Sequence, residues 1–262
     1  MRNLLAANFM RLGRSRILWL CMAYMLYDGL RLFYGATKLT GDVYSRWAPS
    51  FQFLWFAGIA FALYCSFFIS GEYADGGIRN KLIVGTSRLG IYLANLIFCT
   101  AACLLICAAY ILPNWTLEYF FVGERGGLEY IRTSAEIALV LVECVLVVLS
   151  YNAIFLMIGM NIQHKTGGPI AVFLSAAALA YFGQDSRSML LLYDSSPERY
   201  NFSPPVMFRH KLFSDWLPGG QAVHCIELGG FQDPKIMILH ALVVVTASTA
   251  VGICLFQRKD LK

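Results

Sequence analysis

Glu143 is the ionisable side chain that stands deepest within an apolar stretch of this sequence. It lies in the run 135–160, where most other residues are apolar. A carboxylate at the centre of a membrane-spanning helix costs about 3 kcal/mol unless it is paired, hydrated or protonated. Such a group can bind a substrate cation, line a hydrated pathway, or hydrogen-bond to a neighbouring helix. The sequence leaves these roles open for Glu143.

The other residues that could do chemistry form no recognisable catalytic or metal-binding pattern. Cys99, Cys103 and Cys107 share one helix face, but no histidine stands beside them, so packing is the better interpretation. His210 and His224 lie among scattered acidic residues without the spacing of a metal site. We therefore expect no metal, no cofactor and no enzyme activity in this chain.

A phosphate-binding loop is also absent from the sequence. The pattern Gly-x-x-x-x-Gly-Lys followed by Ser or Thr occurs nowhere in the 262 residues. If the protein drives a process with ATP, both ATP and its magnesium ion must therefore bind to another subunit.

The polar segment 72–88 is the second place of interest. It carries both signs of charge and places Ile78 and Leu82 four residues apart, which puts them on one face of a helix. This pattern favours a short surface helix that contacts a partner. A solvated loop that serves only membrane topology is the alternative.

Six apolar stretches hold these residues in place. Hydrophobic residues make up 58% of the chain and charged residues 14%, whereas charged residues are about 25% of a typical soluble domain. We expect a single all-α membrane domain over residues 1–262 with six transmembrane helices. Four are close to or beyond the ~20 residues that a bilayer requires, whereas 17–34 and 169–184 are weaker and the latter is short for a full crossing. The expected spans are 17–34, 51–70, 89–112, 135–160, 169–184 and 236–257. Asp28 and Arg31 interrupt the first span, and their spacing predicts a local ion pair.

The charges of the connecting segments predict the orientation. With both termini in the cytoplasm, the cytoplasmic segments hold eleven basic and three acidic residues, as the positive-inside rule requires. Residues 1–16 have the pattern of an amphipathic helix at the inner membrane interface. In the last outer loop, 184–235, Pro204, Pro205 and Pro218 should divide the chain into short helices.

Small residues at helical spacing mark two faces that could pack closely against another helix. Such faces favour helix association in membranes, either within one chain or between two subunits. The residues of these candidate dimer faces are Gly58, Ala62, Ser66, Gly168, Ala171, Ser175 and Ala178.

The segment 72–88 and the start of the next span resemble the first cytoplasmic loop of bacterial type-2 ATP-binding-cassette exporter permeases. That family has an acidic–aromatic pair, a glycine, Ile-Arg-Asn-Lys-Leu, a second glycine, and Ser-Arg before the next helix. The matching residues are Glu72, Tyr73, Gly77, Ile78, Arg79, Asn80, Lys81, Leu82, Gly85, Ser87 and Arg88. The segment 215–222 is similar to the part that this family places before its last span, where short helices re-enter the membrane.

The resemblance implies a membrane subunit that works as a dimer, with the same or a homologous permease, beside separate cytoplasmic ATPases. It implies alternating access in the bacterial cytoplasmic membrane and no nucleic-acid partner. The ATPase-coupling residues that it implies are Glu72, Tyr73, Ile78, Arg79, Lys81, Leu82 and Arg88.

Two other classes of protein stay open on the residues alone. An ion- or proton-coupled carrier could use Glu143, and a membrane assembly factor or enzyme could be built on the outer loop. The sequence does not identify a substrate.

Overall fold

The computed structural model describes residues 2–39, 51–122, 134–162, 166–196, 198–199, 202–227 and 234–259. Within these ranges the regular structure consists of ten α-helices, and no β-strand occurs. The helices are α1 (Arg2–Leu12), α2 (Arg16–Leu39), α4 (Leu54–Ala74), α5 (Gly77–Ile83), α6 (Arg88–Val122), α7 (Ser134–Asn161), α8 (Gly167–Ser195), α9 (Pro204–Trp216), α10 (Pro218–Ile226) and α11 (Pro234–Arg258). The predicted all-α class is confirmed.

Five of the described helices are long and apolar enough to cross a membrane: α4, α6, α7, α8 and α11. The remaining expected span, 17–34, corresponds to α2, which has 24 residues but falls outside this group. Asp28, Arg31 and several tyrosines reduce its hydropathy. Asp28 does accept a hydrogen bond from Arg31 at 3.1 Å, so the predicted local pair is confirmed.

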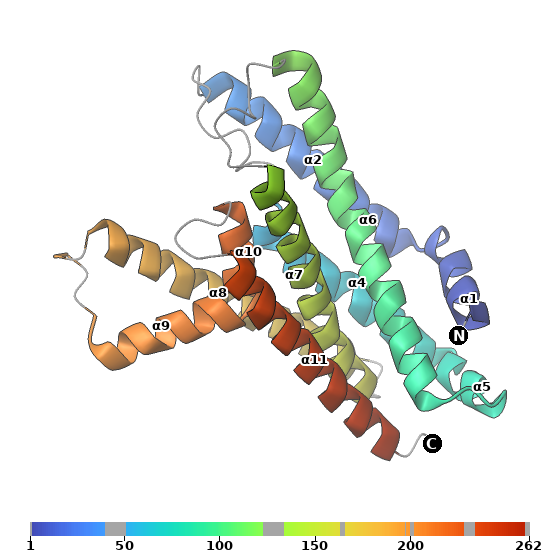
Figure 1. Ribbon diagram of the computed structural model, residues 1–262. Helices are drawn as coiled ribbons and strands as arrows, with labels where there is room; N and C mark the ends of the chain where they lie inside the picture. The colour runs from blue at the N-terminus through green and yellow to red at the C-terminus, as the bar shows by residue number, and fades with distance from the viewer. Residues whose placement is uncertain are drawn as a thin grey trace.

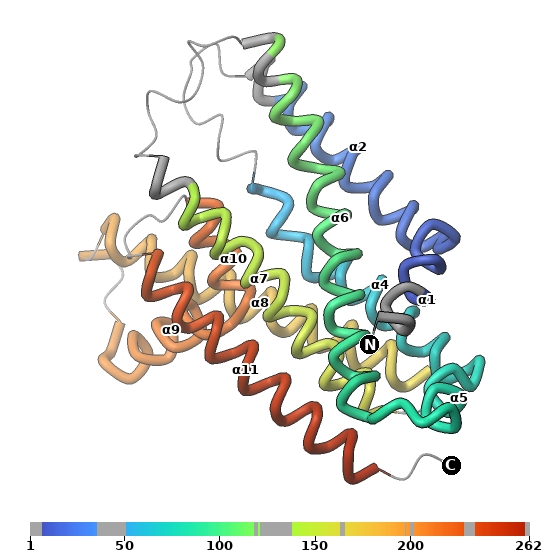
Figure 2. Tube along the Cα trace, turned by 45° about the vertical axis from the view of Figure 1, so that its right-hand side comes forward, coloured from blue at the N-terminus to red at the C-terminus, as the bar shows by residue number. Residues whose placement is uncertain are grey.

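The long helices lie beside one another, and two neighbouring pairs stand out in both views. Helix α2 runs along α6, and α11 runs along α7, while α8 and α9 extend to one side as a V (Figures 1 and 2). Helices α1 and α5 and the last turn of α11 gather at one end of the molecule, which we call the α5 end (Figure 1). Met1 lies outside the described residues.

Helices α4 and α7 pack closely against each other in the core. Tyr151 of α7 packs edge-on against Phe61 of α4, with ring centroids 6.3 Å apart. A Cβ atom at Gly58 would lie 2.9 Å from the Tyr151 ring, so this glycine lets the two helices approach. Ala62 and Ser66 are buried on the same helix. The small residues of α4 therefore serve packing within this chain.

Helices α6 and α8 continue furthest beyond their predicted ends. Helix α6 passes through Pro113, where the predicted span stopped. The Asn114 side chain donates to the Tyr110 carbonyl at 2.8 Å, and Thr116 donates to the Pro113 carbonyl at 2.9 Å. These bonds satisfy carbonyl groups near the proline, whose missing N–H interrupts the helical pattern.

Helix α8 extends eleven residues past the predicted end at 184 because its polar half also finds partners. A Cβ atom at Gly183 would lie only 2.4 Å from the Gly220 nitrogen, so this glycine is a close contact with α10 rather than a helix end. One turn later, Arg187 donates to Glu227 at 2.7 Å. Close packing and an ion pair thus keep this half of α8 helical.

The loop before α11 contains two short helices, α9 and α10, as its prolines predict. Pro204 and Pro218 stand in their first turns, where a missing N–H costs nothing. All residues from Pro218 to Cys225 are buried, and α10 contacts α4, α7, α8 and α9. Helix α10 is therefore part of the core rather than a surface connection.

Candidate functional site

The segment after α4 forms the short helix α5, which the sequence pattern predicts. Gly76, with φ of 66°, and Gly85, with φ of 86°, adopt left-handed backbone conformations on either side of it. Other residues rarely take this conformation. The two glycines therefore set where α5 begins and where the chain turns towards α6.

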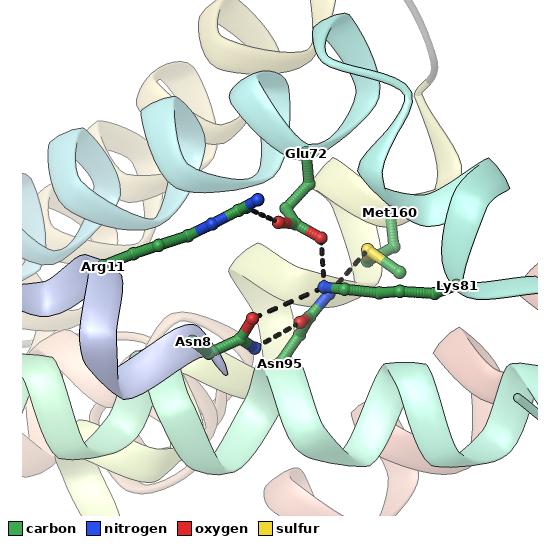
Figure 3. Close-up of polar contacts among 6 residues, drawn as sticks. All are labelled: Asn8, Arg11, Glu72, Lys81, Asn95 and Met160. Carbon is green, nitrogen blue, oxygen red and sulfur yellow. Dashed lines mark hydrogen bonds and ion pairs between the residues drawn. The ribbon is translucent and has the colours of Figure 1, made fainter. Parts of the chain in front are cut away.

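A buried carboxylate ties this segment to two other helices. Both oxygens of Glu72 are paired: Oε1 accepts from Arg11 of α1, and Oε2 accepts from Lys81 of α5 (Figure 3). Glu72 is almost fully buried at the end of α4, whereas the Arg11 side chain is 57% exposed. One negative charge thus meets two positive charges, and α1, α4 and α5 are joined at one point.

Polar contacts extend from this point to α6 and α7. The Asn8 amide donates to Asn95 Oδ1 at 3.2 Å, and the Asn95 amide points to the Met160 sulfur at 3.8 Å (Figure 3). Lys81 also lies 3.4 Å from Asn8 Oδ1, and the Tyr73 hydroxyl donates to the Met160 carbonyl at 2.5 Å. We call Glu72, Arg11, Lys81, Asn8 and Asn95 the Glu72 cluster.

Two cations, Arg88 and Lys259, donate hydrogen bonds to carbonyls at the C-terminal ends of α11 and α7. Arg88 Nη1 donates to the carbonyls of Phe256, Gln257 and Lys259, at 3.1, 2.8 and 2.5 Å. Lys259 in turn donates to the Asn161 carbonyl at the end of α7, and burial lowers the pKa of Lys259. Positive groups are favourable at helix C-termini, where carbonyls lack partners. A movement of α5 and the start of α6 would therefore reach α7 and α11 as well.

The residues predicted for ATPase coupling lie on α4, α5 and α6, and most of them face inwards. Glu72, Tyr73, Lys81 and Arg88 face other helices and hold the segment in place. Ile78 is also buried, and Leu82 packs against the core, so these two cannot form an outward docking face. The apolar side chains that point outwards are Ile83 and Val84, 73% and 84% exposed, beside exposed Arg79.

Glu143 has a partner that sequence reasoning missed. Its Oε1 lies 2.7 Å from His224 Nδ1 of α10, and both side chains are fully buried. The two residues are 81 positions apart. His224 follows Gly219-Gly220 in a short apolar segment, and a histidine in such a segment is the signal that could have indicated a buried partner.

The second oxygen of Glu143 accepts no hydrogen bond from the residues that the structure describes. The thiols of Cys144 and Cys225 lie beside the carboxylate. The Arg187–Glu227 ion pair lies at the end of α10. The Glu143–His224 contact therefore attaches α10 to α7 within the core.

His210, the other outer-loop histidine, lies 3.3 Å from the Ser186 hydroxyl. Burial, followed by the charge of Arg209, lowers its pKa, while Asp185 raises it. Among the described residues, no group of three or more His, Cys, Asp or Glu side chains could hold a metal ion.

The cysteines of the core are packing residues with weak hydrogen bonds. Asn152 Oδ1 lies 3.0 Å from the Cys65 sulfur and 3.4 Å from the Cys103 sulfur. All eight cysteines are free thiols, and seven are buried. These contacts join α4, α6 and α7 in the membrane core.

The candidate dimer faces separate into two parts. Gly58, Ala62 and Ser66 are buried against other helices of the chain, and Gly168 is buried at the start of α8. Ala171 and Ser175 are half-buried, and Ala178 is exposed. Of the seven candidate residues, those on this flank of α8 are the ones accessible to a second subunit.

No family model and no curated protein matches the chain.

Proposed function

We propose that this chain is the membrane-spanning subunit of an ATP-driven exporter, coupled to a separate cytoplasmic ATP-binding-cassette ATPase. In this proposal α2 joins the five apolar helices as a sixth span, and α1, α5 and both termini lie in the cytoplasm of a bacterial cell. A second permease subunit, the same or homologous, would complete the translocation path along the exposed flank of α8.

The observation that carries this proposal is the attachment of α5. This helix presents exposed Ile83 and Val84 outwards, while Lys81 at its rear binds Glu72. Glu72 also binds Arg11, and Arg88, just after α5, binds the end of α11. A force on the exposed tip would therefore act on several helices at once, as alternating access requires.

Site-specific photo-crosslinking in cell membranes tests the proposal. A photoreactive residue at Val84 should form an adduct with a protein that carries a phosphate-binding loop, since Val84 is 84% exposed at the tip. The same residue at Phe120, exposed at the other end of α6, is the matched control and should form no such adduct. An ATPase adduct at both positions, or at neither, would contradict the proposal.

A substitution at the tip then connects docking with transport. Val84→Asp places a charge in the expected contact. The variant should no longer co-purify with the ATPase that the cross-linking experiment identifies, and ATP-dependent transport should be lost. The fold should remain, because surface substitutions of this kind usually change stability by less than ~0.5 kcal/mol. Asp75→Asn, an exposed change at the start of the segment, is the control.

The buried Glu143–His224 pair favours a second candidate function, a proton-coupled carrier. Ionisable groups within membrane helices frequently mark proton pathways. Such a carrier would transport in sealed vesicles that contain no ATP when a pH gradient is applied, whereas the proposed exporter would not.

A further inference from the structure

A pocket of about 140 Å³ opens where α1 and α2 meet α4 and α6. Arg11 and Ser15 line its polar side, and Tyr64, Phe67, Phe68 and Phe98 form an aromatic wall. The rings of Phe68 and Phe98 are 4.6 Å apart, so the wall is continuous. The pocket therefore combines a cation and a hydroxyl with an apolar surface, which suits a ligand that has an anionic head and a hydrocarbon tail.

Among the described residues, the ion pairs on the polar side leave an excess of positive charge. Glu72 has one negative charge and binds both Lys81 and Arg11, so these three groups together are positive. The sequence from Arg2 to Tyr27 adds further arginines, Arg14 and Arg16 among them, and contains no acidic residue. An anion beside Arg11 would offset this excess.

Two features indicate that the pocket faces the membrane interface. Trp19 is exposed and donates its indole N–H to the Gly13 carbonyl at 3.0 Å, and tryptophans of this kind gather at membrane–water boundaries. Phe67, on the aromatic wall, is 51% exposed on a helix that is apolar enough to cross a bilayer. A ligand would therefore enter from the bilayer.

We propose that this pocket binds an anionic membrane phospholipid. The phosphate lies against Arg11 and the Ser15 hydroxyl, and one acyl chain crosses the wall formed by Tyr64, Phe67, Phe68 and Phe98. Arg11 also holds the Glu72 cluster, so the lipid touches the group that joins α1 to α4.

The test measures lipids retained by the purified full-length chain from a mixture of equal phosphatidylglycerol and phosphatidylcholine, by native mass spectrometry. The protein without substitutions should retain more phosphatidylglycerol than phosphatidylcholine. Arg11→Gln should reduce that retention about fivefold, the typical effect of one basic residue at an anionic membrane surface. Arg79→Gln, a substitution of an exposed residue of α5, should leave the retention of phosphatidylglycerol unchanged.

A second variant keeps the Glu72 cluster intact. Phe67→Ala should also reduce retained phosphatidylglycerol, whereas Phe56→Ala should not, although both rings are on α4 and both are 51% exposed. Equal retention of the two lipids, or equal losses in the pocket variants and their controls, would overturn the proposal. Displacement of the lipid by added inorganic phosphate would instead identify a free-anion site and would also overturn it.

Discussion

Two buried carboxylates, Glu72 and Glu143, have opposite environments. At the α5 end, both oxygens of Glu72 are paired with cations, and one of these cations, Arg11, reaches solvent. In the core, one oxygen of Glu143 meets His224, and the other accepts no bond from a described residue. The first arrangement fixes a charge between three helices. The second joins α7 to α10 through a fully buried contact between a carboxyl and an imidazole.

This difference separates mechanical from chemical roles. Glu72 is paired with cations from two other helices, so it holds α1 and α5 against α4. Glu143 contacts His224, and this buried contact holds α10 against α7. We therefore associate Glu72 with the transmission of force and Glu143 with the attachment of α10 to α7.

The largest expected effect is the loss of Glu72. Glu72→Leu leaves Lys81 and Arg11 facing one another without an anion. Removal of one partner from a buried ion pair typically costs about 3–5 kcal/mol, so the free energy of unfolding should fall by about that amount. Titration of the purified protein in mild detergent with a denaturing detergent measures this free energy of unfolding. Asp75→Asn, three residues away and exposed, should change little, and an equal effect in both variants would remove the special status of Glu72.

Replacement of His224 should have the next largest effect. His224→Leu removes the partner of Glu143 and should lower the free energy of unfolding by about 2 kcal/mol, the cost of an unsatisfied buried polar group. The double variant Glu143→Leu/His224→Leu should cost less than the two single changes together, by at least ~1 kcal/mol, because no polar group remains without its partner.

The corresponding double variant at the α5 end sharpens the comparison. Glu72→Leu/Lys81→Leu should show no such recovery, because Arg11 still lacks its anion. Additive effects at Glu143 and His224, or full recovery at Glu72 and Lys81, would show that the two sites do not differ as proposed.

Arg11 and Lys81, the two cations that bind Glu72, should contribute unequally to the free energy of unfolding. The expected changes are smaller than those for Glu72 and His224. The Lys81 side chain is 15% exposed and that of Arg11 is 57% exposed. Exposed ion pairs contribute only about 0.2–1 kcal/mol, so Arg11→Gln should reduce the free energy of unfolding by less than ~1 kcal/mol. Lys81→Gln should cost about 1.5 kcal/mol, since charged hydrogen bonds in buried surroundings contribute more. Detergent unfolding of both variants would compare them, and the reverse order would contradict this assignment.

Much of the fold could be predicted because long apolar stretches leave few choices in a bilayer. The ends of α6 and α8 could not, since Pro113 and Gly183 are frequent helix terminators. Side-chain bonds beside Pro113 and a contact of Gly183 with another helix explain why the two helices continue. Asn114 and Thr116 satisfy carbonyls beside the proline, while Gly183 meets the backbone of α10.

The candidate site could be predicted only in part, because local sequence patterns do not encode contacts between distant residues. The spacing of Ile78 and Leu82 places them on one face of α5, but spacing does not tell whether that face points inwards or outwards. Glu143 stood out because a carboxylate in an apolar span is costly. Its partner His224 did not, because the contact joins residues 81 positions apart and no local pattern encodes it.

The smallest stability change is expected for Glu143→Gln, and it separates the two candidate functions. The glutamine amide can donate to His224 Nδ1 or its oxygen can accept from it, so the contact is kept in either tautomer. The free energy of unfolding should therefore change by less than ~1 kcal/mol. Because the amide does not titrate near neutral pH, transport that depends on a proton at Glu143 should lose its pH dependence. ATP-driven transport should retain its rate and its response to ATP. Transport in sealed vesicles, with a pH gradient or with the ATPase and ATP, measures both, and loss of folded protein in this variant would contradict the assignment of a single replaceable hydrogen bond.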